Sequence, residues 1–307
     1  MIFKDILSEN AEKIDSEFSK LLEIAYHNSI HKGDLLLVYL NGFHEPKMVE
    51  WNEKNSPKLN PHVIGIGQEG HSEGLHYEFI HKYRMENLYP LTHPEYLKQL
   101  VWTPERKTEI DELILKEEYS IQLEMLIYLK VWEADLIIKR FYQLARLLFG
   151  EAYDWYFKIS NSARDRDAIG TRQEIWRKII RNRFRKYSPY LEEFLKDSYK
   201  TQIRNSIAHS NYSFQGRNIH LNNFIKDDPA SQLKVITFDE WAKIFHNTLL
   251  LHNQYISLNN AIDIFYGNHA KNTKEVLPIL VTELDGTQYE LPLEYRVEYN
   301  DWHFAQG

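Results

Sequence analysis

Residues 103–150 read TPERKTEIDELILKEEYSIQLEMLIYLKVWEADLIIKRFYQLARLLFG, and this stretch decides the fold class of the chain. Thr103 is suited to cap a helix, Pro104 to occupy its first turn, and Gly150 to stop it. Between them apolar residues recur at helical intervals, over a surface wide enough to need packing on several sides. The pattern predicts one very long helix or two consecutive helices in a mainly α protein.

Three further helices are predicted after this stretch. Residues 171–187 form an amphipathic pattern with an apolar stripe of Ile, Trp and Phe, and a third helix is expected over residues 190–208. Thr237 and Glu240 form a capping box ahead of a helix over residues 238–265.

Short extended segments interrupt the helices at two places. The runs GRNIHLNN and LKVITF flank a polar turn and predict a small hairpin after the third helix. Near the C-terminus, alternating apolar and polar residues stand on both sides of Asp285-Gly286, a dipeptide that favours a tight hairpin turn. The first hundred residues mix helical spacing with a loop segment rich in Gly, Pro, Asn and His.

Composition restricts the compartment and the chemistry. The 307 residues contain no cysteine, which excludes disulfides, thiolate nucleophiles and Cys-ligated zinc. The most apolar run, residues 123–138, is interrupted by four charged side chains, so it predicts a buried helix and no membrane span. Because the first residues lack the apolar region of a secretory signal, we expect a cytoplasmic protein.

The net charge of −7 is unevenly distributed. Residues 161–190 hold nine Arg or Lys against three acids, a local charge of +6. Such a segment is suited to bind a polyanion, and it is equally typical of a solvated helix face. The side chains expected to contact RNA phosphates from this helix are Arg177, Lys178, Arg181, Arg183 and Arg185.

An arginine and a histidine mark the end of the predicted helix over residues 190–208. There the chain reads RNSIAH from Arg204 to His209, with Asn205 directly after the arginine. On a helix Asn205 and His209 lie one turn apart on one face, while the long Arg204 side chain reaches round from the adjoining position. The string matches the Arg-Asn-x-x-x-His motif of HEPN domains, and the chain resembles the HEPN superfamily.

The resemblance covers roughly residues 104–265. The string DLIIKR, which begins at Asp135, is similar to the acidic-x-x-x-Lys-Arg element of some HEPN clades, with Asp in place of the commoner Glu. The resemblance implies a HEPN-like helical bundle over residues 101–268, with a small β-hairpin after the motif helix. A mixed α/loop extension of unknown role, residues 1–100, and a C-terminal β-hairpin extension, residues 269–307, are expected outside the bundle.

The activity implied by the resemblance is metal-independent cleavage of RNA, in which the 2′-hydroxyl of the RNA is the nucleophile. Histidine transfers protons near neutral pH, and arginine stays cationic beside the phosphate oxygens. Arg204 and His209 are therefore the expected catalytic residues, with Asn205, Asp135 and Lys139 in support. The chain has no P-loop and no metalloprotease motif, and we expect neither a metal nor another cofactor.

Two protomers of this family usually dimerise so that both motifs line one cleft, and a homodimer would supply two histidines per site. The resemblance also implies a bacterial toxin, defence or stress setting, with an antitoxin or another protein as partner and no membrane. The alternative is a non-catalytic HEPN module for dimerisation or for nucleotide or ligand binding. In that case Arg204, Asn205 and His209 only cap carbonyls and pair with acids, and Asp135 and Lys139 form a helix-surface ion pair.

Overall fold

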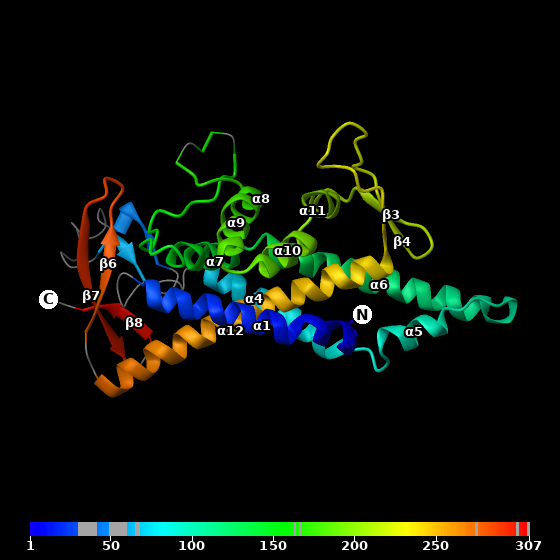
Figure 1. Cartoon of the computed structure of the whole chain (residues 1–307), viewed down its shortest axis with the longest axis horizontal. Helices are drawn as coiled ribbons and strands as arrows, with labels where there is room; N and C mark the ends of the chain where they lie inside the picture. Colours follow the sequence, from blue (N-terminus) through cyan, green and yellow to red (C-terminus); the bar gives the residue numbers. More distant parts are fainter. Residues whose placement is uncertain are drawn as a thin grey trace. The chain divides into compact units, whose positions relative to one another are not determined.

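Helices make up most of the chain, which confirms a mainly α protein, and the described residues also form three small sheets (Figure 1). The computed structural model describes residues 1–29, 42–48, 60–64, 68–162, 164–165, 167–273, 276–298 and 301–305. The chain forms two compact units, each assembled from three segments. Unit 1 contains Met1–Glu17, Leu75–Ala134 and Ser188–Asn253, and unit 2 contains Phe18–Gly74, Asp135–Tyr187 and Gln254–Gly307. Both units combine residues from before and after position 100. The division into residues 1–100, 101–268 and 269–307, which the resemblance implies, stays a prediction.

Unit 1 contains the helix that carries Arg204 and Asn205, which is α11 (Thr201–Ala208). The other helices of this unit are α5 (His93–Gln99), the short 3₁₀ helix η1 (Pro104–Arg106), α6 (Lys107–Trp132) and α10 (Pro189–Ser198). Its strands are β3 (Tyr212–Phe214), β4 (Asn218–Leu221) and β5 (Val235–Thr237). Three helices have residues in both units: α1 (Lys4–Asn28), α4 (Gln68–Glu86) and α12 (Phe238–Thr273).

The stretch that opens the helical region forms two consecutive helices, which confirms the second of the two predicted arrangements. Thr103 precedes η1, Pro104 is its first residue, and α6 follows directly. Helix α6 ends at Trp132, and α7 (Asp135–Leu147) begins two residues after Glu133. Gly150 follows α7 with a φ of +67°, a left-handed conformation in which glycine is favoured.

Aromatic side chains form the core of unit 1. Trp132 of α6 is buried and donates a hydrogen bond to the Thr248 hydroxyl of α12 at 3.1 Å. Tyr128, one turn earlier on α6, packs on Trp241 of α12 with ring centroids 5.7 Å apart. The Phe3 ring is buried in the same unit.

A single helix over residues 190–208 was predicted, and this prediction is wrong. The chain forms α10 and α11, separated by Tyr199 and Lys200, both in extended conformations. The Tyr199 ring lies 5.0 Å from the Trp132 ring, and the Lys200 backbone N–H donates to the Tyr128 hydroxyl at 3.2 Å. Tertiary contacts with α6 therefore replace the hydrogen bonds that a continuous helix would make.

The hairpin expected after the motif helix is confirmed and is larger than predicted. Strands β4 and β5 pair in antiparallel fashion, with Ile219 opposite Ile236, and β3 adds a third strand on the other side of β4. The capping box is also confirmed, because the Glu240 carboxylate accepts from both the backbone and the hydroxyl of Thr237. Helix α12 extends beyond residue 265, to Thr273.

The helices of unit 2 pack around α7. Residues 171–187 are helical as predicted, in the sequence α8 (Arg172–Glu174), the π-helical segment η2 (Ile175–Ile180) and α9 (Arg181–Tyr187). Their apolar stripe packs on α7, where Phe141 lies 5.6 Å from the ring of Trp176.

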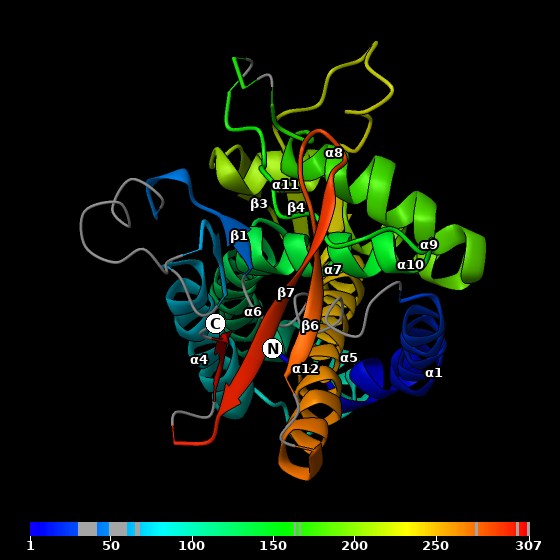
Figure 2. The ribbon, with the colours of Figure 1, turned by 90° about the vertical axis from the view of Figure 1, so that its left-hand side faces the viewer.

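The strands of unit 2 form two small sheets. They are β1 (Phe43–His44), β2 (His62–Val63), β6 (Leu277–Thr282), β7 (Gln288–Arg296) and β8 (Asp301–Phe304). Figure 2 shows β6 and β7 side by side as the orange and red strands, paired in antiparallel fashion. The predicted hairpin turn at Asp285-Gly286 is confirmed, with Gly286 at a φ of +85°. Strand β8 extends this hairpin and was not predicted.

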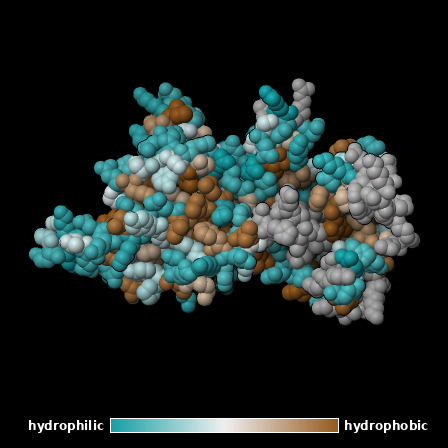
Figure 3. All heavy atoms as spheres, turned by 180° about the vertical axis from the view of Figure 1, so that it is seen from behind, coloured by the Kyte–Doolittle hydropathy of each residue, from teal (hydrophilic) through white to brown (hydrophobic). Residues whose placement is uncertain are grey.

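Hydrophilic residues cover much of the face seen in Figure 3, with hydrophobic patches among them. Helix α6 contributes an exposed apolar stripe of four side chains, Leu115, Tyr119, Leu123 and Leu126. Among the helices in the described residues, none carries a run long and apolar enough to span a bilayer.

Candidate functional site at the end of helix α11

The motif ends at a tight turn that terminates α11. The His209 N–H still bonds the Asn205 carbonyl at 3.1 Å, and Ser210 then adopts a left-handed φ of +52°. Ser206 and Asn211 close the turn, because the Asn211 N–H donates to the Ser206 carbonyl at 2.7 Å and the Ser206 hydroxyl donates to the Asn211 carbonyl. The turn therefore fixes the backbone on both sides of the histidine.

The His209 side chain is exposed at this turn. Its ring makes no hydrogen bond or ion pair with any residue that the structure describes. Both ring nitrogens are accordingly accessible to an external molecule, as a proton-transfer group requires.

Arg204 lies five residues before the histidine, in a different setting. Its guanidinium forms an ion pair with Glu133 and donates to the Asn205 side-chain oxygen at 2.9 Å. The hydrogen bond that Arg204 donates to the Glu133 carboxylate raises the pKa of Arg204, so the guanidinium stays charged. The side chain is 28% exposed, which leaves part of its surface open to solvent.

Asn205 contacts Arg204, because its side-chain oxygen accepts a hydrogen bond from the guanidinium. Glu133 was not singled out from the sequence. It closes the end of α6, where its N–H bonds the Leu129 carbonyl at 2.8 Å, and it lies 71 residues from Arg204 along the chain. No local spacing signals a pair so far apart.

The other two predicted supporting residues lie on α7 and have partners in unit 2. Arg172 donates to the Asp135 carboxylate at 2.7 Å, with a second contact at 2.6 Å. Lys139 is buried and donates to the Gly42 carbonyl at 2.8 Å. Because Arg204 and His209 belong to unit 1, a supporting role for Asp135 and Lys139 stays a prediction.

The basic residues of α8–α9 also belong to unit 2. Arg177, Lys178 and Arg185 are exposed, whereas Arg181 and Arg183 are half-buried. Lys178 pairs with Glu174 at 2.8 Å and, with the Thr171 contacts, lowers the pKa of that carboxylate to about 2. Arg183 is held against α7, bonded to Glu151 at 2.9 Å. The exposed members of this set can contact a polyanion, and their RNA-binding role stays a prediction.

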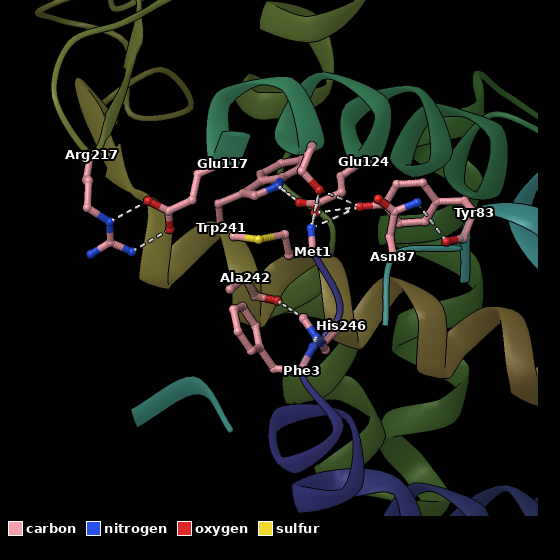
Figure 4. A network of polar contacts seen from close by, with 11 residues as sticks. Met1, Phe3, Tyr83, Asn87, Glu117, Glu124, Arg217, Trp241, Ala242 and His246 are labelled. Carbon is pink, nitrogen blue, oxygen red and sulfur yellow. Dashed lines mark hydrogen bonds and ion pairs between the residues drawn. The ribbon is translucent and has the colours of Figure 1, made fainter. Parts of the chain in front are cut away.

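A buried polar network stabilises unit 1 (Figure 4). The Glu124 carboxylate of α6 accepts from the Trp241 indole at 2.7 Å, from Tyr83 at 2.8 Å and from the Met1 amine. Burial and the neighbouring Glu124 charge raise the pKa of Tyr83. These groups are satisfied by one another, so the network is structural.

An ion pair between Arg217 and Glu117, also drawn in Figure 4, connects the β3–β4–β5 sheet to α6. Arg217, just before β4, donates to both oxygens of buried Glu117 at 2.8 Å and to Asp239 at 2.8 Å. Burial raises the pKa of Glu117 despite this partner. The ion pair anchors the strand that pairs with the residues following His209.

No protein-family model, curated protein or solved structure matches this chain. Within the described residues, no three or more His, Asp or Glu side chains are grouped so that they could hold a metal ion. The resemblance to HEPN domains therefore remains an expectation based on the motif.

Proposed function

We propose that this protein is an endoribonuclease of HEPN type, acting in a toxin, defence or stress setting, that cleaves RNA without a metal ion. The observation that carries the proposal is the arrangement at the end of α11. There an exposed imidazole lies five residues after a guanidinium held in place by Glu133 and Asn205.

The reaction is transesterification within the RNA. A base takes the 2′-hydroxyl proton, the 2′-oxygen attacks phosphorus, and the bond from phosphorus to the 5′-oxygen breaks. An acid protonates the departing 5′-oxygen, leaving a 2′,3′-cyclic phosphate and a 5′-hydroxyl. His209 performs one proton transfer, and Arg204 neutralises the charge that develops on the phosphate oxygens.

One histidine per chain supplies an acid or a base, and the reaction requires both. A homodimer with two motifs in one cleft provides the second imidazole. The proposal therefore includes a composite site at a dimer interface.

The test is cleavage of single-stranded RNA by the purified protein in EDTA, with the cyclic phosphate detected by mass spectrometry. Arg204→Ala and His209→Ala are expected to lower the rate by at least about a hundredfold each. Two variants serve as matched controls. His81→Ala removes an exposed histidine of α4, and Arg106→Ala removes an arginine that is similarly exposed and paired with Glu109. The proposal fails if both motif variants cut as fast as these controls.

A second candidate function is a non-catalytic dimerisation or ligand-binding module. The ion pair with Glu133 favours it, because a guanidinium already paired within its own chain is typical of a structural arginine. In that case the wild type leaves RNA intact, and Arg204→Ala lowers stability or dimer affinity instead.

A further inference from the structure

A 13-residue loop, residues 222–234, connects β4 to β5 beside the motif. It begins next to the turn that carries His209, because the Asn222 N–H donates to the Asn211 carbonyl at 3.0 Å. Its two ends are close, since the Leu221 N–H bonds the Lys234 carbonyl at 2.9 Å. Compact loops of this length with adjacent ends are frequently functional.

Gln202 of α11 fastens this loop to the motif helix. Its buried side-chain amide donates to the Leu233 carbonyl at 2.7 Å and accepts from the Leu233 N–H at 2.9 Å. The Asn223 side-chain amide donates a hydrogen bond to the Gln202 backbone carbonyl at 2.9 Å. Gln202 precedes His209 by seven residues, nearly two helical turns, so the loop runs along the side of α11 that leads to the histidine.

The loop is also braced from within. Asp228 accepts from the Ala230 N–H at 2.9 Å and from the Ser231 hydroxyl at 2.7 Å, and these contacts lower its pKa. The Gln232 side chain donates to the Ile225 carbonyl at 2.9 Å. Asp228 is thus occupied in holding the turn, and the loop keeps its shape without regular secondary structure.

The loop holds two lysines and two aspartates, of which Asp227 is exposed beside Lys226, together with apolar side chains on its outer surface. Lys226 and Lys234 are exposed, and the Lys234 ammonium lies 4.6 Å above the ring of half-buried Phe224. Ile225 is 58% exposed. Lysines bind phosphates as point charges, and apolar side chains contact bases that are not paired in a duplex.

We propose that residues 222–234 are the arm that docks single-stranded RNA at this site. Lys226 and Lys234 hold phosphates beside the one that is cleaved, and Phe224 and Ile225 contact an unstacked base. This inference rests on the proposed function and adds to it the residues that position the substrate.

The test measures binding of 2′-O-methyl RNA, which lacks the nucleophile, so the result does not depend on cleavage. Fluorescence anisotropy compares a labelled single strand with its duplex. The double variant Lys226→Ala/Lys234→Ala is expected to bind the single strand about tenfold more weakly, with a salt dependence shallower by about 1.4 on the log–log plot.

The matched control is Lys98→Ala/Lys107→Ala, which removes two exposed lysines of unit 1. Lys107 is the first residue of α6, whereas Glu133, the partner of Arg204, follows its last residue. The rise of the helix places the two residues about 39 Å apart. This variant is expected to bind like the wild type.

The outcomes separate the two proposals. If the loop variant binds like the control, or if the wild type prefers the duplex, the inference about the loop is wrong even when the wild type cuts RNA. If the loop variant loses binding while the wild type leaves unmodified RNA intact, the docking arm stands and the nuclease proposal fails.

Discussion

The ion pair between Arg204 and Glu133 sets the charge available to a phosphate at the end of α11. A carboxylate that already engages the guanidinium competes with any incoming anion. The pair also fixes the direction of the arginine side chain, as a transition-state donor requires. The same contact therefore organises the site and weakens its attraction for RNA.

Glu133→Gln keeps the size and the hydrogen-bond acceptor of this residue but removes its charge. We expect single-stranded RNA to bind about threefold more tightly, with a steeper salt dependence, because Arg204 then interacts more fully with phosphate. Anisotropy with 2′-O-methyl RNA measures this, and Glu109→Gln, which removes the charge paired with half-buried Arg106, is the matched control. Unchanged or weaker binding by Glu133→Gln would contradict the competition argument.

Contacts distant in sequence hold the elements around the motif in place. The three-stranded sheet is fastened to α6 by Arg217, whose partner Glu117 is almost fully buried. Removing one member of a buried pair leaves the other charge without compensation.

Arg217→Met is accordingly expected to lower the free energy of unfolding by about 3–5 kcal/mol, measured by urea denaturation. The double variant Arg217→Met/Glu117→Gln should recover a large part of this loss, because no buried charge then remains. A single variant as stable as the wild type would show that Glu117 is solvated after all.

The β6–β7 hairpin depends on the backbone of its turn. Gly286 has a φ of +85° and open space where a Cβ would stand, so Gly286→Ala suffers conformational strain alone. We expect a loss of about 1 kcal/mol, seen as a lower melting temperature. Gly267→Ala in α12, also in open space and without a positive φ, should instead stabilise the protein by up to about 1 kcal/mol. Equal effects of the two variants would refute this reasoning.

At the scale of the whole molecule, buried histidines make stability depend on pH. Burial lowers the pKa of His246 and of His252 on α12 to about 4 each, whereas an unfolded histidine titrates near 6.5. His246 is kept neutral in a defined tautomer, because its Nε2 accepts from the Phe3 N–H at 2.8 Å while the Ala242 carbonyl lies 2.6 Å from Nδ1.

Because the unfolded chain binds these protons more readily, stability is highest above pH 6.5 and falls as the pH is lowered toward 4. The expected loss is about 3 kcal/mol per histidine. Urea denaturation at intervals across this window measures the slope. His252→Gln should reduce the proton uptake on unfolding by about one, and a stability that does not change between pH 7 and pH 4 would contradict the assignment.

Local patterns in the sequence were sufficient to predict the helices over residues 103–150 and 171–187, the start of α12 with its capping box, the Asp285-Gly286 turn and the position of Arg204 and His209 at a helix end. Helical periodicity, caps and tight turns depend on residues within about four positions of one another, so neighbouring side chains determine them. The exposure of His209 at its turn, by contrast, could not be predicted from the spacing of the motif.

Only the tertiary structure decided where the predicted helix over residues 190–208 breaks, that Glu133 binds Arg204, and that Gln202 fastens the loop 222–234 to α11. Each depends on packing between segments separated by 21 to 72 residues. Burial against α6 outweighs the helical propensity of Tyr199 and Lys200, since the aromatic contact and the hydrogen bond to Tyr128 exist only when the unit is assembled.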